Sequence, residues 1–222
     1  MYNVLSTLKN ACINFVAPPF CSYCKVFIQT RTVFCDYCKS RIVPVASVTM
    51  PLTGNYSIKT FAICAYQDPI KKLILAKGWS DICASKNLGQ LMWDMTNLKH
   101  MPIDYLIPIP LHWTRLAKRG FNQTVEIANE ISRKSNMPIA NILKRTKRTQ
   151  FQATLSAGQR GKNVKDAFAL QCNNTNASLY AGKHLVLVDD LMTTGSTLQA
   201  AARELVKLKP ASITAVVACR VV

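Results

Sequence analysis

The stretch VLVDDLMTTGSTLQAA, Val186 to Ala201, passes from an apolar strand through two adjacent carboxylates into a hydroxyl-rich turn and then a helix. The two carboxylates, Asp189 and Asp190, can accept hydrogen bonds from the vicinal hydroxyls of a ribose. Gly195 permits a close backbone approach, and the first N–H groups of the following helix favour a phosphate. The hydroxyl donors of the turn are Thr193, Thr194, Ser196 and Thr197. The stretch therefore predicts a site for a phosphorylated ribose.

Two other interpretations compete with this one. Ser, Thr and Asp also end strands and cap helices without any ligand. Two ionised groups directly after an apolar strand are, however, costly to bury unless something binds them. The VLVDD run could also belong to a nucleotide triphosphatase, but the G-x-x-x-x-G-K-[ST] phosphate loop occurs nowhere in the chain.

Apolar strands and amphipathic helices alternate on both sides of this stretch. Near-continuous apolar strands are typical of a parallel sheet flanked on both faces by helices, so the sequence predicts an α/β fold. Ligands of such sheets bind at the carboxyl ends of the strands, where the two aspartates stand. The predicted strands are 60–66, 104–110, 184–190 and 212–222, and the predicted helices are 69–77, 81–98, 123–135 and 196–208.

Four cysteines near the amino terminus form two C-x-x-C pairs, FCSYC and FCDYC. Each pair can direct two sulfurs to one ion, and two pairs complete the four ligands of a structural zinc site. A redox role needs one pair beside a thioredoxin-like βαβ unit, which the sequence does not offer. Four thiolates leave no position for a catalytic water, so the zinc would stabilise the fold. The predicted ligands are Cys21, Cys24, Cys35 and Cys38.

These patterns divide the chain into two units. We expect residues 1–55 to form a short N-terminal helix and the zinc module, and residues 56–222 to form the α/β domain. No stretch reaches the ~18 apolar residues of a membrane span, and the start lacks the features of a signal peptide, so we expect a cytoplasmic location. A reducing compartment favours metal binding over disulfides. For the other cysteines we expect core packing: Cys12, Cys64, Cys83, Cys172 and Cys219.

The chain is strongly basic. Lysine and arginine number 28 against 11 acidic residues, which gives a formal charge of +17. Such an excess favours a polyanionic partner, nucleic acid or a membrane surface, although a basic enzyme with a multiply phosphorylated substrate is an alternative. The segment 144–166 is polar, basic and weakly periodic, which is typical of a long loop that is functional or disordered.

The stretch around Asp189 resembles the signature of type I phosphoribosyltransferases that binds 5-phosphoribosyl-1-pyrophosphate (PRPP). Residues 107–124 and 148–168 are similar to two further signatures of the ComF family, so the resemblance spans nearly the whole chain. It implies that Asp189 and Asp190 hold the ribose hydroxyls and that residues 193–197 hold the 5′-phosphate. It also implies a loop facing the pyrophosphate, with candidates His112, Arg115 and Arg119. A lone histidine carries little information, so a packed surface role is the alternative for the first of these.

The resemblance further implies a part in DNA uptake during natural transformation, beside other proteins of the competence machinery. On this interpretation the basic surface follows a single strand of DNA, and its bases stack on interleaved aromatic side chains. The candidate aromatics are Trp113, Phe121 and Phe151, and core packing is the alternative for each.

An active phosphoribosyltransferase is the second functional interpretation. It would transfer ribosyl phosphate from PRPP to a nitrogen nucleophile, with Mg²⁺ and basic side chains neutralising the departing pyrophosphate. A lid formed by the long basic loop would exclude water. The candidate lid residues are Arg148, Arg160 and Lys162. The sequence names no acceptor nitrogen, so whether the chain is an enzyme stays open.

Overall fold

The computed structural model describes residues 18–76, 81–146, 167–171 and 177–222. The strands are β1 (Val48–Pro51), β2 (Ser57–Ala65), β3 (Tyr105–Pro108), β4 (Leu143–Arg145), β5 (Phe168–Leu170), β6 (His184–Val188), β7 (Leu191–Met192) and β8 (Ser212–Arg220). The α-helices are α2 (Asp36–Ser40), α3 (Ile70–Ala76), α4 (Ile82–Met95), α5 (Trp113–Arg119), α6 (Gln123–Ser135) and α9 (Ser196–Val206). Two short 3-10 helices are η2 (Asn97–His100) and η3 (Ser178–Tyr180).

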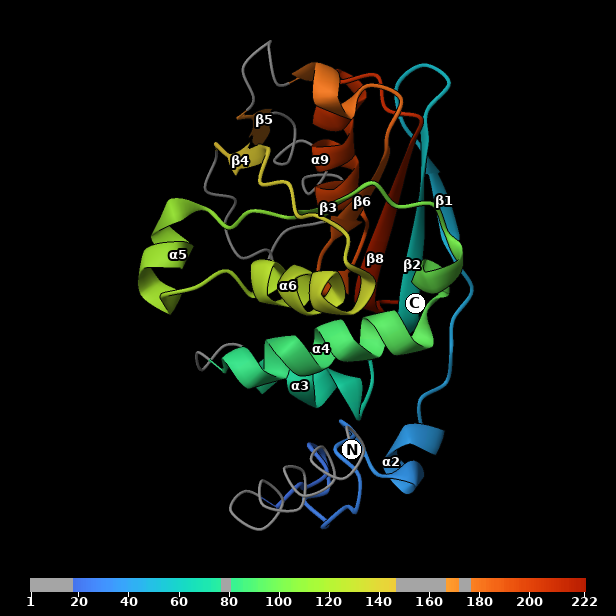
Figure 1. The fold of residues 1–222 in the computed structure, drawn as a ribbon, viewed down its shortest axis with the longest axis vertical. Helices are drawn as coiled ribbons and strands as arrows, with labels where there is room; N and C mark the ends of the chain where they lie inside the picture. Colours follow the sequence, from blue (N-terminus) through green and yellow to red (C-terminus); the bar gives the residue numbers. More distant parts are fainter. Residues whose placement is uncertain (1–17, 77–80, 147–166, 172–176) are drawn as a thin grey trace, which may run out of the picture.

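The main sheet has the strand order β1-β2-β8-β6-β3, with β7 paired to β8 (Figure 1). Strands β2, β8, β6 and β3 run parallel, and helices cover both faces of the sheet. The predicted α/β fold is confirmed, with one difference. The edge strand β1 is antiparallel to β2 because a short turn at 52–56, which contains Gly54 with φ of +64°, folds the chain back as a hairpin.

The two faces of the sheet bury separate cores. On β6, Leu185 and Leu187 join the core under α9, whereas Val186 and Val188 join the core under α4 and α6. Successive side chains of a strand point to opposite faces, so a strand buried on both faces is apolar throughout. This explains the unbroken apolar run of the sequence just before the aspartates.

Most predicted elements are present, and their ends differ by a few residues. The helix at 123–135 has the predicted bounds, whereas the helix predicted to reach residue 98 ends at Met95 and is followed by η2. The strand predicted at 104–110 ends at Pro108. Several short features were not predicted, among them β1, the helix α5, and the pairing of β4 with β5. These elements are only two turns or a few residues long, so their apolar patterns are too short to indicate a helix or a strand.

Some predicted features lie wholly or partly outside the described residues. The helix expected near the amino terminus lies within residues 1–17, outside the described residues. Of the basic segment 144–166, only the first residues are described, and these belong to β4 and its end. The sheet includes β1, which the predicted division places in the N-terminal unit, and the division itself stays a prediction. Among the described helices, none combines the length and apolar character needed to cross a membrane.

The close packing of α4 on α6 depends on Gly89. A Cβ atom at this position would lie 2.7 Å from the backbone oxygen of Ile127 and 2.9 Å from the Cβ of Glu130. Glycine inside a helix ordinarily costs about 1 kcal/mol relative to alanine. Here we expect the reverse: Gly89→Ala should lower the free energy of unfolding by about 1–3 kcal/mol because α6 must move away.

Urea denaturation of the variant and the wild type measures this difference. The control is Lys86→Ala, at an exposed position of the same helix, which should leave the midpoint nearly unchanged. An unchanged or raised midpoint for Gly89→Ala would show that α4 and α6 can accommodate a Cβ atom at this position.

Candidate functional site

The carboxyl ends of β3 and β6 lie side by side and bring two predicted site segments together. The parallel register pairs Pro108 with Val188. Just beyond these residues, the N–H of Ile109 donates to the carbonyl of Val188 at 3.0 Å. The loop that leads to α5 and the pair of aspartates therefore leave the same edge of the sheet.

The two aspartates differ in their surroundings. Asp190 is 7% exposed, whereas Asp189 is partly exposed. The Asp189 carboxylate accepts a hydrogen bond from the N–H of Asp190 at 2.9 Å. The carbonyl of Asp190 accepts hydrogen bonds from the N–H groups of Ala218 and Cys219 on β8. The backbone of this pair is thus fixed to the sheet, with both carboxylates at the mouth of β6.

The predicted phosphate loop connects β7 to α9. Gly195 is the N-cap residue of α9 and has φ of +77°, in the left-handed region that favours glycine. The hydroxyls of Thr194 and Ser196 lie 3.0 Å apart, and Thr193 and Thr194 are exposed. The predicted hydroxyl donors therefore gather where α9 begins.

The tight contact at Gly195 is with the protein interior. A Cβ atom there would lie 2.5 Å from the Sδ of Met50 and 3.0 Å from the Cε of Met192. The close approach of a ligand expected at this glycine stays a prediction, and the structure adds a second reason for the glycine. The positive φ itself favours glycine, and a Cβ atom would also press against the ends of the Met50 and Met192 side chains.

The loop after β3 is held by hydrogen bonds at both of its ends. His112 is 8% exposed and is the N-cap residue of α5, with its Nδ1 atom 2.9 Å from the Thr114 hydroxyl oxygen. At the start of α6, the Thr124 hydroxyl donates to the Ile109 carbonyl at 2.6 Å, and the Asn122 amide donates to the same carbonyl at 3.2 Å. The histidine is therefore buried and caps a helix, and it is not a surface residue.

Arg145 of β4 lies near the same edge, although the sequence placed it only in a basic loop. Burial lowers the pKa of its guanidinium, the positive charge of Arg115 lowers it further, and the negative charge of Asp189 raises it. The guanidinium carbon also lies 5.3 Å from the centre of the Phe168 ring on β5. The structure thus brings Arg145 within electrostatic reach of Asp189 and of Arg115, which comes from a different element. No local pattern could predict this, because two three-residue strands give no periodic signal.

The remaining predicted residues are divided between described and undescribed parts of the chain. Arg119 lies in the last turn of α5, the Trp113 side chain is exposed at its start, and Phe121 is partly buried after it. The other predicted lid and stacking residues lie outside the described residues: Arg148, Phe151, Arg160 and Lys162.

The four cysteines of the two pairs form one cluster. The sulfur atoms of Cys21, Cys24, Cys35 and Cys38 all lie within 4.8 Å of one another. The sulfurs of Cys24 and Cys35 are 3.7 Å apart. A tetrahedral zinc site with Zn–S bonds of about 2.3 Å separates its sulfurs by about 3.8 Å. The arrangement therefore fits a tetrahedral metal ion, and the cluster could bind a metal such as zinc.

The electrostatics of the cluster also suit a cation. Burial raises the pKa of the Cys21 thiol, but backbone N–H groups, chiefly that of Cys35, oppose this and lower it to about 6. Burial raises the pKa of the Cys38 thiol to about 12, and hydrogen bonds to the neighbouring cysteines add to this shift. Four thiolates this close repel one another, so their joint ionisation needs a positive ion at the centre.

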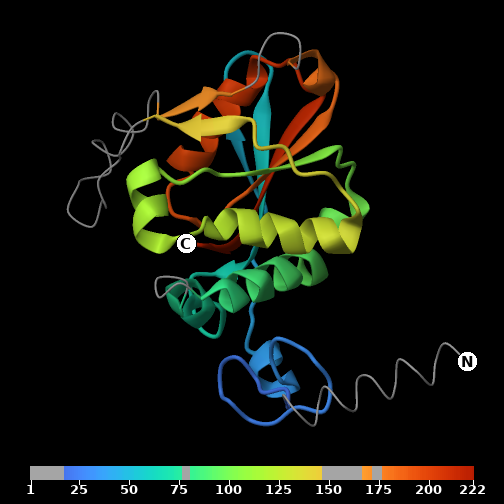
Figure 2. The same ribbon diagram turned by 60° about the vertical axis from the view of Figure 1, so that its left-hand side comes forward.

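The cysteine cluster is joined to the α/β domain by polar and apolar contacts. The Tyr23 hydroxyl donates to the Asp68 carboxylate at 2.9 Å, and the Lys72 ammonium lies 5.0 Å from the centre of the Tyr23 ring. Phe34 and Leu73 of α3 belong to one continuous core. Figure 1 and Figure 2 show this part of the chain below α3 and α4.

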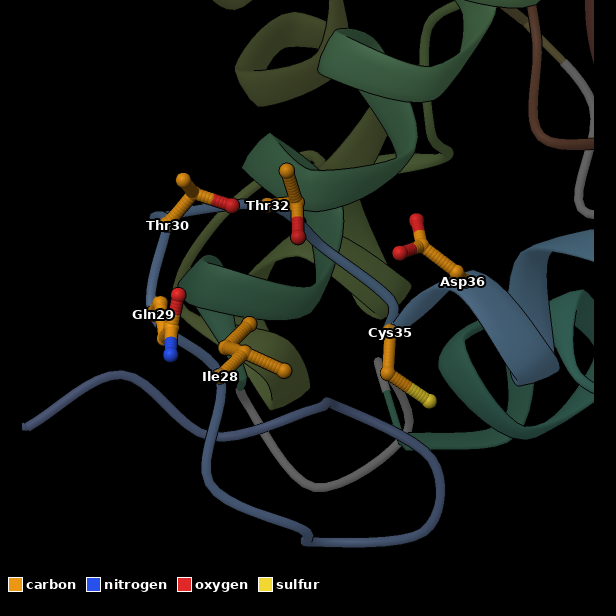
Figure 3. Close-up of a pocket in the computed structure, with 6 residues that line it drawn as sticks. All are labelled: Ile28, Gln29, Thr30, Thr32, Cys35 and Asp36. Carbon is orange, nitrogen blue, oxygen red and sulfur yellow. The ribbon is translucent and has the colours of Figure 1, made fainter.

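A hollow of about 350 Å³ lies beside the cysteine cluster (Figure 3). It is lined by Ile28, Gln29, Thr30, Thr32, Cys35 and Asp36. It reaches the cluster through Cys35 and has no residue in common with the carboxyl edge of the sheet. The hollow is therefore separate from the site at the strand ends.

We expected the remaining cysteines to pack in the core, and the structure describes three of them. Cys64 and Cys219 are buried on the paired strands β2 and β8, with their sulfurs 3.6 Å apart, so the expectation is confirmed for them. It is wrong for Cys83, which is exposed because α4 buries the face that carries Ala84 and Leu88. Cys12 and Cys172 lie outside the described residues.

Known proteins resemble this chain over much of its length. Residues 116–221 match the family described as phosphoribosyl transferase domain. Competence protein F of Haemophilus influenzae is 29% identical over 86% of this chain and 80% of its own length. DNA utilization protein YhgH of Salmonella typhimurium is 31% identical over 90% of this chain and 89% of its own length. The chain belongs to the ComF family.

A further ComF-family relative is competence protein ComFC of Bacillus subtilis. It is 36% identical over 49% of this chain and 41% of its own length. The phosphoribosyl transferase match begins inside α5 and ends at the close of β8, so it includes β6, the two aspartates and the loop before α9. The resemblance inferred from the sequence is thereby confirmed at the level of the family and the fold.

The cysteine cluster leads to a prediction about metal. We expect about one zinc per chain in protein purified without added metal, because the four sulfurs match one tetrahedral site. Cys38→Ser should lose the zinc and lower the melting temperature, since the variant removes a ligand from the cluster.

The control is Cys83→Ser, which removes an exposed thiol outside the cluster and should change neither quantity. Elemental analysis and thermal denaturation measure both. A well-folded wild type without metal would exclude the zinc site.

Proposed function

We propose that this ComF-family protein binds PRPP or a closely related phosphorylated ribose, and that it serves DNA uptake by binding single-stranded DNA. One observation carries the first part. The aspartate pair at the end of β6 lies beside the loop before α9, and Arg145 of β4 comes within electrostatic reach of both Asp189 and Arg115 of α5. Acceptors for ribose hydroxyls, donors for a phosphate and cations for a pyrophosphate are then close together.

The role of each group follows from its chemistry. Asp190 and Asp189 would accept hydrogen bonds from the ribose hydroxyls. The loop from Thr193 to Thr197 would donate hydroxyl and N–H groups to the 5′-phosphate at the start of α9. Asp190 suits the more specific contact, because it is nearly buried and its backbone is fixed to β8.

The pyrophosphate would lie toward the loop after β3. Arg115 and Arg119 are our candidates for its oxygens, and Arg145 adds positive charge from β4. His112 would act mainly by holding the start of α5 in place. Mg²⁺ bound with PRPP would neutralise part of the charge of the pyrophosphate, and the aspartates offer the oxygen ligands that Mg²⁺ prefers.

The second part, binding of single-stranded DNA, rests on charge and on the relatives. The chain carries a formal charge of +17, far beyond what one sugar phosphate requires. Two relatives are named for competence and one for DNA utilization. We propose a cytoplasmic place for this chain and contacts with other proteins of the competence machinery.

An active phosphoribosyltransferase is the second candidate, and the complete aspartate and threonine motif favours it. The reaction would break the bond between the sugar C1 and the pyrophosphate and join that carbon to a nitrogen nucleophile. Arg148, Arg160 and Lys162, outside the described residues, would close over the leaving group. Release of pyrophosphate from PRPP in the presence of candidate bases would distinguish this enzyme from a binding protein.

The sugar-phosphate site is tested through one carboxylate. Asp190→Asn keeps the size of the side chain and removes its charge, so it should weaken PRPP binding about 10- to 100-fold, the usual effect of removing a charged hydrogen bond. Calorimetry with PRPP and Mg²⁺ measures the affinity.

The control is Asp94→Asn, which changes an exposed carboxylate of α4 and should leave the affinity unchanged. Arg115→Ala should weaken PRPP and spare ribose 5-phosphate, which lacks the pyrophosphate. Equal affinity of wild type and Asp190→Asn for PRPP would remove this aspartate from the site.

The DNA function and the enzyme function are separated by one double variant. If the basic loop contacts DNA, replacing Lys147 and Arg148 with alanine should make the salt dependence of single-strand binding shallower, by ~0.7 in log–log slope for each phosphate that the protein no longer neutralises. If the loop is instead a catalytic lid, the same change should suppress pyrophosphate release and leave DNA binding intact. Both positions lie outside the described residues.

The matched control replaces Arg133 and Lys134, an adjacent basic pair in the last turn of α6. It should alter neither measurement. An unchanged slope together with abolished turnover in the loop variant would exclude a DNA role for this loop.

A further inference from the structure

Helix α5 buries none of its residues. It spans Trp113–Arg119, and Figure 1 and Figure 2 place it at the side of the molecule that β4 and β5 also occupy. A helix of two turns is not stable by itself in water. Here it is held at its ends: His112 caps its start, and Gly120, with φ of +77°, donates its N–H to the Leu116 carbonyl at its close. The helix is therefore fixed in place while none of its side chains is buried.

Trp113 is the most unusual residue of this helix. Its side chain is 71% exposed, although tryptophan is normally well buried. By comparison, Trp93 of α4 packs against the main core. The ring of His112 lies beside that of Trp113, with centroids 5.7 Å apart and planes inclined by 36°. A large flat apolar surface is thus presented to solvent from an anchored backbone.

The surroundings of Trp113 are cationic. Helix α5 has no acidic residue and carries Arg115, Lys118 and Arg119. Arg145 of β4 is close enough to Arg115 for their charges to interact. An aromatic plane among cations fits a single strand of nucleic acid, in which bases offer flat faces and phosphates offer negative charge.

A membrane surface fits these features less well. The only other large exposed apolar side chain of the helix is Leu116, at 42%, so α5 lacks the broad apolar face of an interfacial helix. The local charges and shapes therefore favour nucleic acid.

We propose that α5 is a base-stacking element, in which Trp113 stacks on a nucleobase of single-stranded DNA while Lys118 contacts its phosphates. This inference rests on the proposed DNA-binding function and names the surface that performs part of it. Stacking is tolerant of base identity, so the contact gives affinity without sequence preference. The strand would pass beside the carboxyl edge of the sheet, next to the aspartate pair.

The test compares two probes that differ only in their bases. One is a fluorescently labelled oligo-dT, and the other is an abasic oligodeoxynucleotide of the same length, which keeps the phosphates and has no base to stack. Trp113→Ala should weaken oligo-dT binding about 10-fold, within the usual range for one stacked base, and leave abasic binding unchanged. Trp113→Phe should restore most of the affinity for oligo-dT because it keeps an aromatic face.

The matched control is Leu116→Ala, which removes the other large exposed apolar side chain of the same helix and should change neither affinity. Fluorescence anisotropy of both probes with all four proteins decides the question. Equal weakening of both probes by Trp113→Ala, or no weakening of either, would overturn the stacking role while leaving DNA binding in place. The stacking role would also be overturned if wild type floats with phosphatidylserine vesicles, Trp113→Ala does not, and Trp113→Ala still binds oligo-dT.

One further result would bear on the DNA-binding function as a whole. A wild type that binds neither oligo-dT nor the abasic probe would overturn the DNA-binding function and the stacking role together. Binding of PRPP by the same preparation, measured by calorimetry, would then show that the sugar-phosphate site is intact and that only the DNA part has failed.

Discussion

The parallel pairing of β6 between β3 and β8 is the constraint on which the rest of the site depends. Backbone hydrogen bonds continue past the end of β6, from Ile109 to Val188 on one side and from Asp189 to Val216 on the other. A shift of one residue would exchange the leucines and valines of β6 between two different cores, so the register is strongly fixed. The aspartate pair can therefore stand at only one place.

Charge at this edge is arranged by several elements that are distant in sequence. A nearly buried carboxylate such as Asp190 is costly unless cations or donors are near. Arg115 arrives on α5 and Arg145 on β4, and both act on the same region. The hydrogen bonds of Thr124 and Asn122 to the Ile109 carbonyl set the path of the chain into and out of α5. These two hydrogen bonds behind the site thus help to determine the position of Arg115 on α5.

The cysteine cluster solves a different physical problem. A segment as short as this one cannot bury enough apolar surface to fold independently. It shares a core with α3 through Phe34 and Leu73, and Tyr23 holds it to Asp68. A metal ion bound by the four clustered sulfurs would strengthen these contacts. The cluster lies away from the strand ends, so we expect it to stabilise the fold and to present a surface rather than to take part in the site.

The sequence by itself determined the features whose signal is local. The unbroken apolar run before Asp189 indicated a strand buried on both faces, and two C-x-x-C pairs predicted the cysteine cluster because they suffice for four ligands. Only the tertiary structure decided which distant groups meet. It revealed that Met50, from an antiparallel edge strand, is a close neighbour of Gly195. It brought Arg145 to the aspartates through a pair of three-residue strands, and it left Trp113 exposed on a helix with no buried face. Such contacts depend on chain segments far apart in sequence, whereas propensity and periodicity report only on neighbours along the chain.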